Sequence, residues 1–121
     1  MSAIAHPTPA QAAGGDAEDR AAALLARHGL DIVARNYRTR MGEIDLVARD
    51  GDCLVFVEVR SRAGPSYGGA LESVTPAKRR RIVAAARHFL LAYKRLPPCR
   101  FDVIALDAGD PRWIRNAFDV S

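Results

Sequence analysis

Three acidic residues, Glu43, Asp45 and Glu58, stand in two segments that are otherwise rich in Val, Ile, Leu and Phe. Acids in such segments are costly to bury, because unpaired carboxylates repel each other and lose their water. Two interpretations follow from the residues alone. The first is a solvent-facing edge hairpin in which Arg60 pairs with a carboxylate. The second is a site for Mg²⁺ or Mn²⁺, which takes oxygen ligands from one or two carboxylates and retains several water molecules.

A β-hairpin is expected to position these acids. Residues 42–49 and 52–60 form its two arms, and Asp50 and Gly51 form its turn, because this pair tolerates the positive φ angles of a tight turn. In this register Asp45 faces Phe56. A four-residue turn leaves the same side chains on each face, whereas a one-residue bulge does not. Because side chains alternate along a strand, one face carries Glu43, Asp45, Glu58 and Arg60, and the other carries Ile44, Leu46, Val55, Val57 and Val59. Asp45 and Glu58 are then diagonal neighbours, about 7–8 Å apart at Cα, so both carboxylates reach a common point.

The hairpin also carries a family resemblance. Gly-Glu-Ile-Asp-Leu at 42–46, followed by Phe-Val-Glu-Val-Arg at 56–60, resembles the signature of the YraN family of small bacterial proteins. This family is assigned to the restriction-endonuclease-like PD-(D/E)XK superfamily, which includes Holliday-junction resolvases. The resemblance extends from about Asp16 to Asp119. Its further matching pieces are Ala17-Glu18-Asp19 with Ala21 and Ala22, Asn36-Tyr37-Arg38, Thr75-Pro76 with Lys78, and Phe101-Asp102-Val103.

The resemblance implies metal-dependent hydrolysis of phosphodiester bonds. The catalytic residues would be Glu18, Asp45, Glu58 and Arg60. Asp45, Glu58 and the main-chain carbonyl of Val59 would bind Mg²⁺ or Mn²⁺, with Glu18 joining directly or through water. Glu43 would lie outside the ligand set, as a partner of Arg60 or Arg38.

Arg60 departs from the superfamily pattern, which usually has lysine at this position. Arginine stays charged and is a poor general base, although it can stabilise a charged transition state. Two functions therefore remain open: an endonuclease that acts on branched or flapped DNA intermediates of recombination or repair, and a nucleic-acid-binding protein on the same fold with weak or no catalysis. A protein-interaction domain is a third, and DNA is favoured over RNA as the partner.

Charge is distributed unevenly along the chain. Its formal net charge is +4, and between Arg60 and Arg100 there are ten Lys or Arg but one acid, Glu72. A polyanion that contacts one basic surface suits this asymmetry, and so does a plain solvated helix face. The candidate nucleic-acid contacts are Arg38, Arg62, Tyr67, Lys78, Arg79, Arg80 and Arg81.

A single domain over residues 16–121, preceded by a mobile tail at 1–15, fits the length of 121 residues. No apolar run is long enough to span a membrane, and the N-terminus does not resemble a secretory signal. Cys53 and Cys99 are expected to be reduced thiols of a cytoplasmic protein. A homodimer would suit the cutting of two strands, although no exposed apolar helix face in the sequence demands one.

An α/β fold with a restriction-endonuclease-like core is expected, in which helices flank a mixed sheet in the order α-β-β-β-α-β-β. The first helix covers 16–28, and Glu18 lies at the margin of its apolar stripe. Thr75 and Pro76 begin the second helix, which runs to about Tyr93, with Lys78 extending its core stripe toward the acids. The expected strands are 31–37, the two hairpin arms, 100–107 and 113–119, and residues 61–74 are expected to form a long loop.

Overall fold

Five strands form one mixed sheet in the computed structural model, which describes residues 9–61, 67–106 and 110–119. The strands lie in chain order, and only β3 and β4 run parallel. Their bounds are β1 Asp31–Arg38, β2 Glu43–Asp50, β3 Cys53–Arg60, β4 Cys99–Ala105 and β5 Arg112–Phe118. The predicted α/β fold with a mixed sheet is therefore confirmed.

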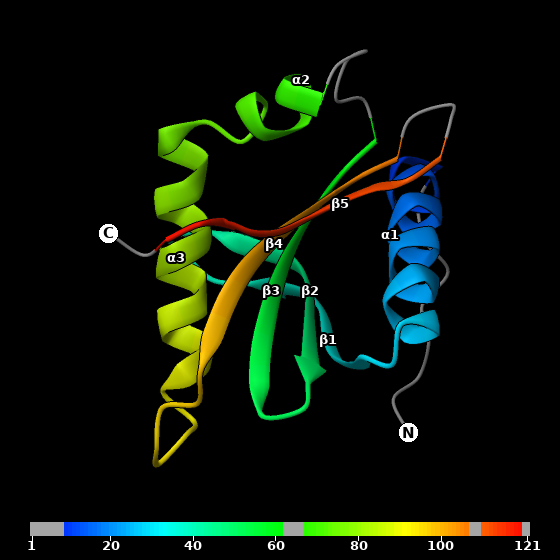
Figure 1. Ribbon diagram of the computed structural model, residues 1–121. Coiled ribbons are helices and arrows are strands. Elements are labelled where there is room, and N and C mark those ends of the chain that lie inside the picture. Colours follow the sequence, from blue (N-terminus) through cyan, green and yellow to red (C-terminus); the bar gives the residue numbers. More distant parts are fainter. Residues whose placement is uncertain (1–8, 62–66, 107–109, 120–121) are drawn as a thin grey trace.

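Helices cover both faces of the sheet (Figure 1). Helix α1 (Pro9–Arg27) lies on one face and α3 (Pro76–Leu90) on the other, while the short α2 (Tyr67–Glu72) precedes α3. The parallel pair β3 and β4 requires a crossover connection, and α2 with α3 supplies it. No helix within these described ranges is long and apolar enough to cross a bilayer.

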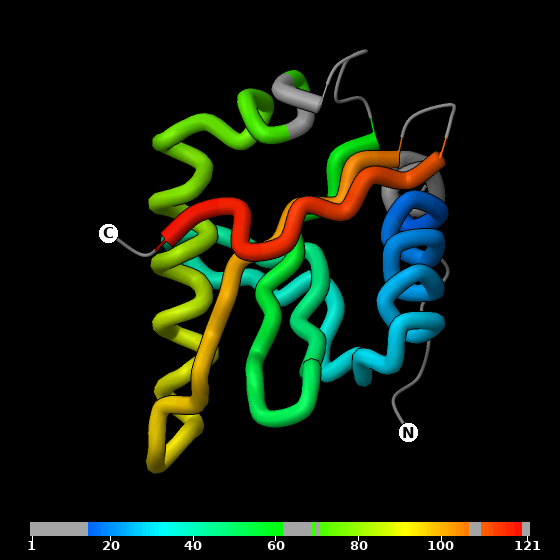
Figure 2. Tube along the Cα trace, in the orientation of Figure 1, coloured from blue at the N-terminus to red at the C-terminus, as the bar shows by residue number. Residues whose placement is uncertain are grey.

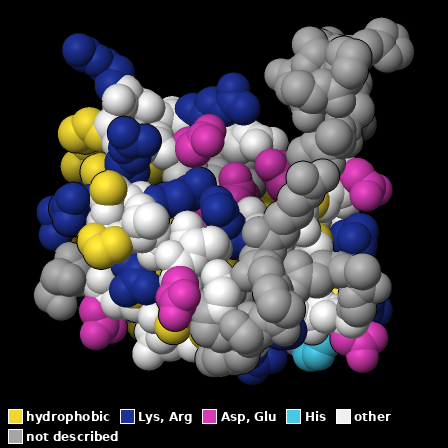
Figure 3. Space-filling view, turned by 90° about the horizontal axis from the view of Figure 1, so that it is seen from above, with side chains coloured by type: hydrophobic (Ala, Val, Ile, Leu, Met, Phe, Trp, Pro, Cys, Tyr) yellow, Lys and Arg dark blue, Asp and Glu magenta, His cyan; other side chains and the backbone are white. Residues whose placement is uncertain are grey.

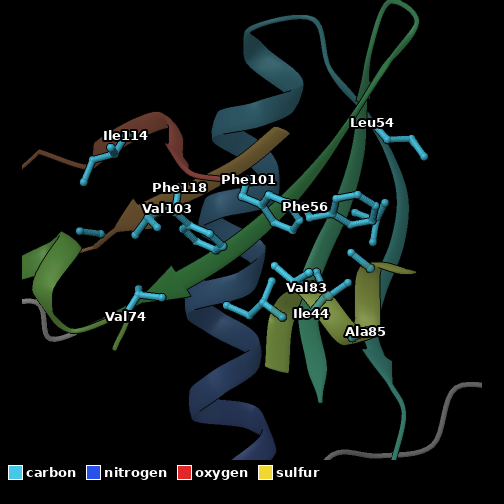
Figure 4. Packing of buried hydrophobic residues seen from close by; sticks show 14 residues of the cluster. Ile44, Leu54, Phe56, Val74, Val83, Ala85, Phe101, Val103, Ile114 and Phe118 are labelled. Carbon is cyan, nitrogen blue, oxygen red and sulfur yellow. The ribbon is translucent and has the colours of Figure 1, made fainter. Parts of the chain in front are cut away.

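Two hydrophobic cores lie on either side of the sheet. Under α3, Phe56 and Phe101 stack with ring centroids 5.4 Å apart, and Ile82 and Ala85 close the layer from the helix (Figure 4). Under α1, Ala21 and Leu25 pack on the opposite face of the sheet. The central strands β2 and β3 are thus buried on both faces, which explains their dense Val, Ile and Leu content.

The first helix begins earlier than predicted. α1 starts at Pro9, not at Asp16, and includes Gly14 and Gly15. The alanines before the two glycines have a high helix propensity, which outweighs the cost of the glycines. The rest of the predicted tail, residues 1–8, lies outside the described residues.

The predicted hairpin forms with a different register. The turn residues are Gly51 and Asp52, since Asp50 pairs with Cys53 and Gly51 has a φ of +61°. This shift of two positions preserves the facing of the side chains. Phe56 pairs with Val47 instead of the predicted Asp45, and the paired residues end at Leu46 and Val57.

The predicted alternation along β2 is wrong at one point. Leu46 shares a face with Val55 and Val57 as predicted, and this face packs under α1, whereas Ile44 packs under α3. Pairing between β2 and β3 ends at Leu46, and the neighbouring strand β1 carries Asn36 at a positive φ of 52°. The sheet is therefore irregular around Asp45, and this acid lies where β2 and β3 separate.

Most other boundaries agree with the sequence within a few residues. The exception is the predicted loop at 61–74, in which the short α2 forms; residues 62–66 lie outside the described residues. Figure 2 shows that the end of β3 and the start of α3 lie at one end of the molecule, while the β2–β3 turn lies at the other. The acids of the hairpin and the first turns of α3 therefore meet at the same end.

Candidate functional site

Glu58 is a buried carboxylate held between two cations. Its side chain is only 5 % exposed, and its Oε2 lies 3.0 Å from Lys78 Nζ and 3.2 Å from Arg60 Nη1. Arg60 also donates from Nε to Ser73 Oγ at 3.1 Å, which fixes its guanidinium. Both cations are themselves partly exposed. Glu58 is thus neutralised from the α3 side of the sheet, while the cations keep access to solvent.

Asp45 lies beside Glu58 at the fork between β2 and β3. Its Oδ2 accepts a hydrogen bond of 2.8 Å from the backbone N–H of Val59. Burial, and then the negative charge of Glu58, raise the pKa of Asp45 to about 8, against the lowering effect of the Val59 N–H. A hydrogen bond between the two carboxyl groups acts in the raising direction as well. Asp45 therefore releases its proton less readily than an ordinary aspartate.

Glu18 approaches the pair from α1, the helix on the other face of the sheet. Its Oε1 accepts a hydrogen bond of 2.8 Å from Asn36 Nδ2 on β1. Burial raises the pKa of Glu18, and the negative charge of Glu18 in turn raises the pKa of Asp45. Asn36 tolerates its positive φ because asparagine adopts the left-handed region more readily than most residues. The positive φ at Asn36 thus goes with an amide that faces the acid on the helix.

The carboxylates of Asp45 and Glu58 are the candidate ligands for a divalent metal ion. Among the described residues, no three of His, Cys, Asp and Glu lie close enough together to form a metal cluster by themselves. Burial and the charge of Glu58 nevertheless raise the pKa of Asp45, and a cation bound between the two carboxylates would relieve this repulsion. Two carboxylates with retained water are enough to bind Mg²⁺ or Mn²⁺. The donor set therefore fits a hard cation.

A basic cavity of about 580 Å³ opens beside Lys78, which contacts Glu58. The β1–β2 loop lines one side of it, and Lys78 and Arg81 line the other. Its single acid, Glu43, pairs with Arg38 at 3.2 Å, and Arg38 is one of the two partners expected for it. Gly42 lets the loop approach α3, because a Cβ at this position would lie 2.1 Å from the Arg81 carbonyl oxygen.

The three consecutive arginines of α3 lie in different surroundings. Arg81 is exposed and lines the basic cavity. Arg80 is exposed on another side of the helix, in a second groove with Arg87 and Phe118. Arg79 is used within the fold: its guanidinium donates to the Val74 and Leu71 carbonyl oxygens and stacks on the Phe118 ring.

Two predicted contacts are not placed. Arg62 lies outside the described residues, and Tyr67 is described only through its backbone, as the first residue of α2. Lys78, by contrast, occupies a position that the sequence suggested, since its place on the core stripe of α3 directed it toward the acids of the hairpin.

A second buried acid lies away from this pair. Asp102 on β4 is fully buried and accepts hydrogen bonds from Arg100 Nε at 3.1 Å, Trp113 Nε1 at 2.9 Å and the Asn116 backbone N–H at 2.9 Å. Its oxygens are saturated by donors that join β4 to β5. Asp102 therefore stabilises the sheet edge.

Charge on the site end of the molecule is shown in Figure 3. Acidic side chains lie near the middle of this face, and Lys and Arg side chains lie beside them. Cys53 and Cys99 are both free, as predicted. Lys78 and Arg60 thus border Glu58 with cations of the kind that bind phosphate groups.

Comparison with known proteins identifies the family. The model of the "Uncharacterised protein family UPF0102" matches residues 17–106. A UPF0102 protein of Cupriavidus taiwanensis is 59% identical over 110 residues, which cover 90% of this chain and 84% of that protein. A relative from Methylibium petroleiphilum is 53% identical over 118 residues, covering 92% of this chain and 97% of that protein. The chain therefore belongs to the UPF0102 family, which is the YraN family that its hairpin resembles.

Proposed function

We propose that this protein is a metal-dependent endonuclease that hydrolyses phosphodiester bonds in DNA, including branched or flapped intermediates of recombination or repair. The observation that carries the proposal is the Asp45–Glu58 pair. Burial and mutual repulsion raise the pKa of Asp45 to about 8 beside the two cations Lys78 and Arg60. A protein that needs only a stable fold gains nothing from such a pair, and strongly perturbed carboxylates of this kind cluster at functional sites.

Asp45 and Glu58 would hold Mg²⁺ or Mn²⁺ in this account, with the Val59 carbonyl as a further ligand and Glu18 acting through water. When bound, the ion supplies a water molecule of lowered pKa and stabilises negative charge on the phosphate. The residues of the chain prepare this position. The Val59 N–H fixes Asp45 Oδ2, and Lys78 with Arg60 fixes Glu58 Oε2.

Lys78 is the group best suited to take the role of the superfamily's lysine, because Arg60 occupies the position of that lysine in this chain. An ammonium group can give up and regain a proton, whereas the guanidinium of Arg60 remains charged. Both contact the same oxygen of Glu58. We assign to Lys78 Nζ the transfer of a proton to or from the attacking water. Arg60 would orient Glu58 and balance the charge of the phosphate.

The basic cavity supplies the contacts to the nucleic acid. Arg40 and Arg81 are exposed, line this cavity and form no ion pair with a described residue. Free guanidinium groups next to a hydrolytic site bind phosphates and position the strand. The binding surface and the acid pair are continuous because Lys78 belongs to both.

A cleavage assay on a panel of nucleic acids tests the proposal. Single-stranded, duplex, flapped and four-way-junction DNA, together with RNA, are incubated with the protein in Mg²⁺, in Mn²⁺ and in EDTA. We expect cleavage of at least one DNA member in the metals only, and its loss in Asp45→Ala and in Glu58→Ala. Asp52→Ala, which changes an exposed acid in the β2–β3 turn, is the matched control and retains cleavage.

Binding without cleavage on every member of the panel would contradict the endonuclease. It would support the alternative function, a nucleic-acid-binding protein on the same fold. Cleavage that persists in both acid variants would point to a contaminating nuclease or to a different site.

A further inference from the structure

Three cavities along one flank of α3 share lining residues. The basic cavity beside Lys78 shares the loop residues 38–41 with a second cavity of about 570 Å³, which also touches His88. His88 in turn lines a third cavity of about 580 Å³, together with Leu91 and Tyr93. We call these three neighbouring cavities the α3 groove. It leads away from the acid pair along the helix toward its C-terminal end.

The chemistry of the α3 groove changes along its length. At the end near Glu58 it is cationic, with Arg40, Lys78 and Arg81 in its lining. At the far end its lining is aromatic and apolar, with Tyr37, His88, Phe89, Leu91, Ala92 and Tyr93. Met41 lies between the two ends and is 60% exposed, while Leu91 is 79% exposed. Exposed apolar side chains that line a groove next to cations indicate a binding surface.

The aromatic end is held rigid by contacts within the fold. The Tyr37 hydroxyl and His88 Nδ1 form a hydrogen bond, and the Phe89 ring packs edge-on against Tyr37 with centroids 5.1 Å apart. Tyr93 packs on Phe89 at a centroid distance of 5.9 Å. Side chains that are already ordered lose little entropy when a ligand binds to them. The rings are therefore preorganised for stacking.

We propose that the α3 groove binds a single-stranded segment of DNA beside the phosphate that is cut. Backbone phosphates contact Arg40 and Arg81, and unpaired bases contact Met41, His88 and Tyr93. Proteins that bind single strands combine a basic groove with aromatic platforms in this way, whereas a duplex keeps its base faces stacked internally. The proposal rests on the proposed endonuclease and narrows its substrate to DNA with an unpaired strand.

The dimensions of the groove agree with a short strand. Lys78 and His88 are ten residues apart on α3, so they are separated by about 15 Å along the helix. At about 3.4 Å per stacked nucleotide, this length accommodates about four nucleotides. Glu43, the acid in the cationic end, is already paired with Arg38, so it opposes the approach of a phosphate only weakly.

Binding in EDTA tests the groove separately from cleavage. The anisotropy of a labelled single-stranded oligonucleotide is compared with that of a linear duplex and of an RNA of the same sequence. We expect Tyr93→Leu, which keeps an apolar contact to Phe89 but removes the ring, to weaken single-strand binding at least about fivefold. Duplex binding is expected to be unchanged in this variant. Arg40→Ala is expected to reduce the log–log salt slope for the single strand by about 0.7.

Two matched controls separate the groove from general surface effects. Leu96 is 76% exposed but does not line the groove, so Leu96→Ser should leave single-strand binding unchanged while Leu91→Ser weakens it. Arg95 is exposed beyond the end of α3, and Arg95→Ala is the counterpart of Arg40→Ala. Equal losses in Leu96→Ser and Leu91→Ser would overturn the proposal.

Photo-crosslinking of the wild-type chain gives a readout that does not depend on any variant folding. An oligonucleotide that carries 5-iodouracil is crosslinked, and the modified peptides are mapped by mass spectrometry. Crosslinks within residues 37–41 or 88–93 are expected, and crosslinks found only elsewhere would overturn the proposal.

Different results would contradict the proposed single-strand groove and the proposed endonuclease. Tyr93-dependent binding of single strands without cleavage of any substrate keeps the groove and rejects the endonuclease. Metal-dependent cleavage with unchanged binding in Tyr93→Leu rejects the groove alone. Tighter binding of the RNA than of the DNA would overturn the choice of DNA, and the absence of any nucleic-acid binding would overturn both.

Discussion

Lys78 Nζ lies 3.0 Å from Glu58 Oε2, the same oxygen that Arg60 contacts from 3.2 Å. Lys78 and Glu58 come from different elements, since Lys78 is in the first turn of α3 and Glu58 is near the end of β3. Thr75 caps α3 by accepting a hydrogen bond from the Lys78 backbone N–H at 3.2 Å. The start of the helix, and with it the position of the lysine, is therefore set by the Thr75-Pro76 signal.

We predict that Lys78 has a role in cleavage that arginine cannot fill. Lys78→Met and Lys78→Arg should both lower single-turnover cleavage about 100-fold, in the range of a lost proton-transfer group. Single-strand binding in EDTA should decrease much less. Arg60→Lys should retain cleavage, because a lysine there still contacts the carboxylate.

Lys94→Met is the control for this series, since Lys94 is an exposed lysine beyond α3. Full cleavage by Lys78→Arg would show that only the positive charge matters. The assignment of proton handling to Lys78 would then be wrong.

Stability should fall as pH rises because of Asp45. Its pKa is raised from 3.8 to about 8, so between these values the folded protein retains a proton that the unfolded chain has lost. The contribution of this group is fully present below pH 3.8 and is lost as pH rises through about 8. Asp45→Asn removes this dependence, and its amide oxygen can still accept the Val59 N–H bond.

Urea unfolding in EDTA at pH 5 and at pH 9 measures this effect. Relative to Asp45→Asn, the wild type should lose at least about 1 kcal/mol of unfolding free energy at the higher pH, since one unit of pKa corresponds to about 1.4 kcal/mol. Parallel pH profiles of the two proteins would contradict the assignment.

Gly42→Ala should separate the β1–β2 loop from α3. The added Cβ would lie 2.1 Å from the Arg81 carbonyl oxygen, which is backbone and cannot rotate away. We expect a loss of about 1–3 kcal/mol in unfolding free energy and weaker DNA binding, because the loop carries one wall of the basic cavity. Gly15→Ala, at a position with open space around its Cβ, is the control and should not destabilise the protein.

Asp102→Ala should destabilise the protein without bearing on the acid pair. The substitution removes the acceptor of three donor groups and leaves Arg100 unpaired on that side. Removing one partner of a buried ion pair typically costs about 3–5 kcal/mol. Denaturant unfolding measures this loss, and a change below about 1 kcal/mol would contradict the structural role.

Much of the site is predictable from short-range patterns. Strand alternation predicted that Asp45 and Glu58 lie close together, and they do so although the register differs by two residues. The approach of Lys78 followed from the helical stripe it shares with Ile82 and Ala85. Both inferences use periodicities that the backbone imposes regardless of the rest of the fold.

The remainder depends on contacts between distant segments. Glu18 meets Asn36 only because the sheet is irregular there, and its only local signal is an asparagine, which tolerates positive φ. Ile44 changes face at the same irregularity. Arg79 folds back onto carbonyls of the preceding segment and onto Phe118, which no local pattern distinguishes from Arg80 or Arg81.

The most direct test of the acid pair is Mn²⁺-dependent cleavage by Asp45→Asn measured beside the wild type on the same flapped DNA. DNA binding in EDTA is measured in the same preparations. The account predicts that Asp45→Asn binds the DNA as well as the wild type and does not cut it. Cleavage at the wild-type rate by this variant, or no cleavage by either protein, would contradict the central claim that Asp45 and Glu58 form a hydrolytic metal site.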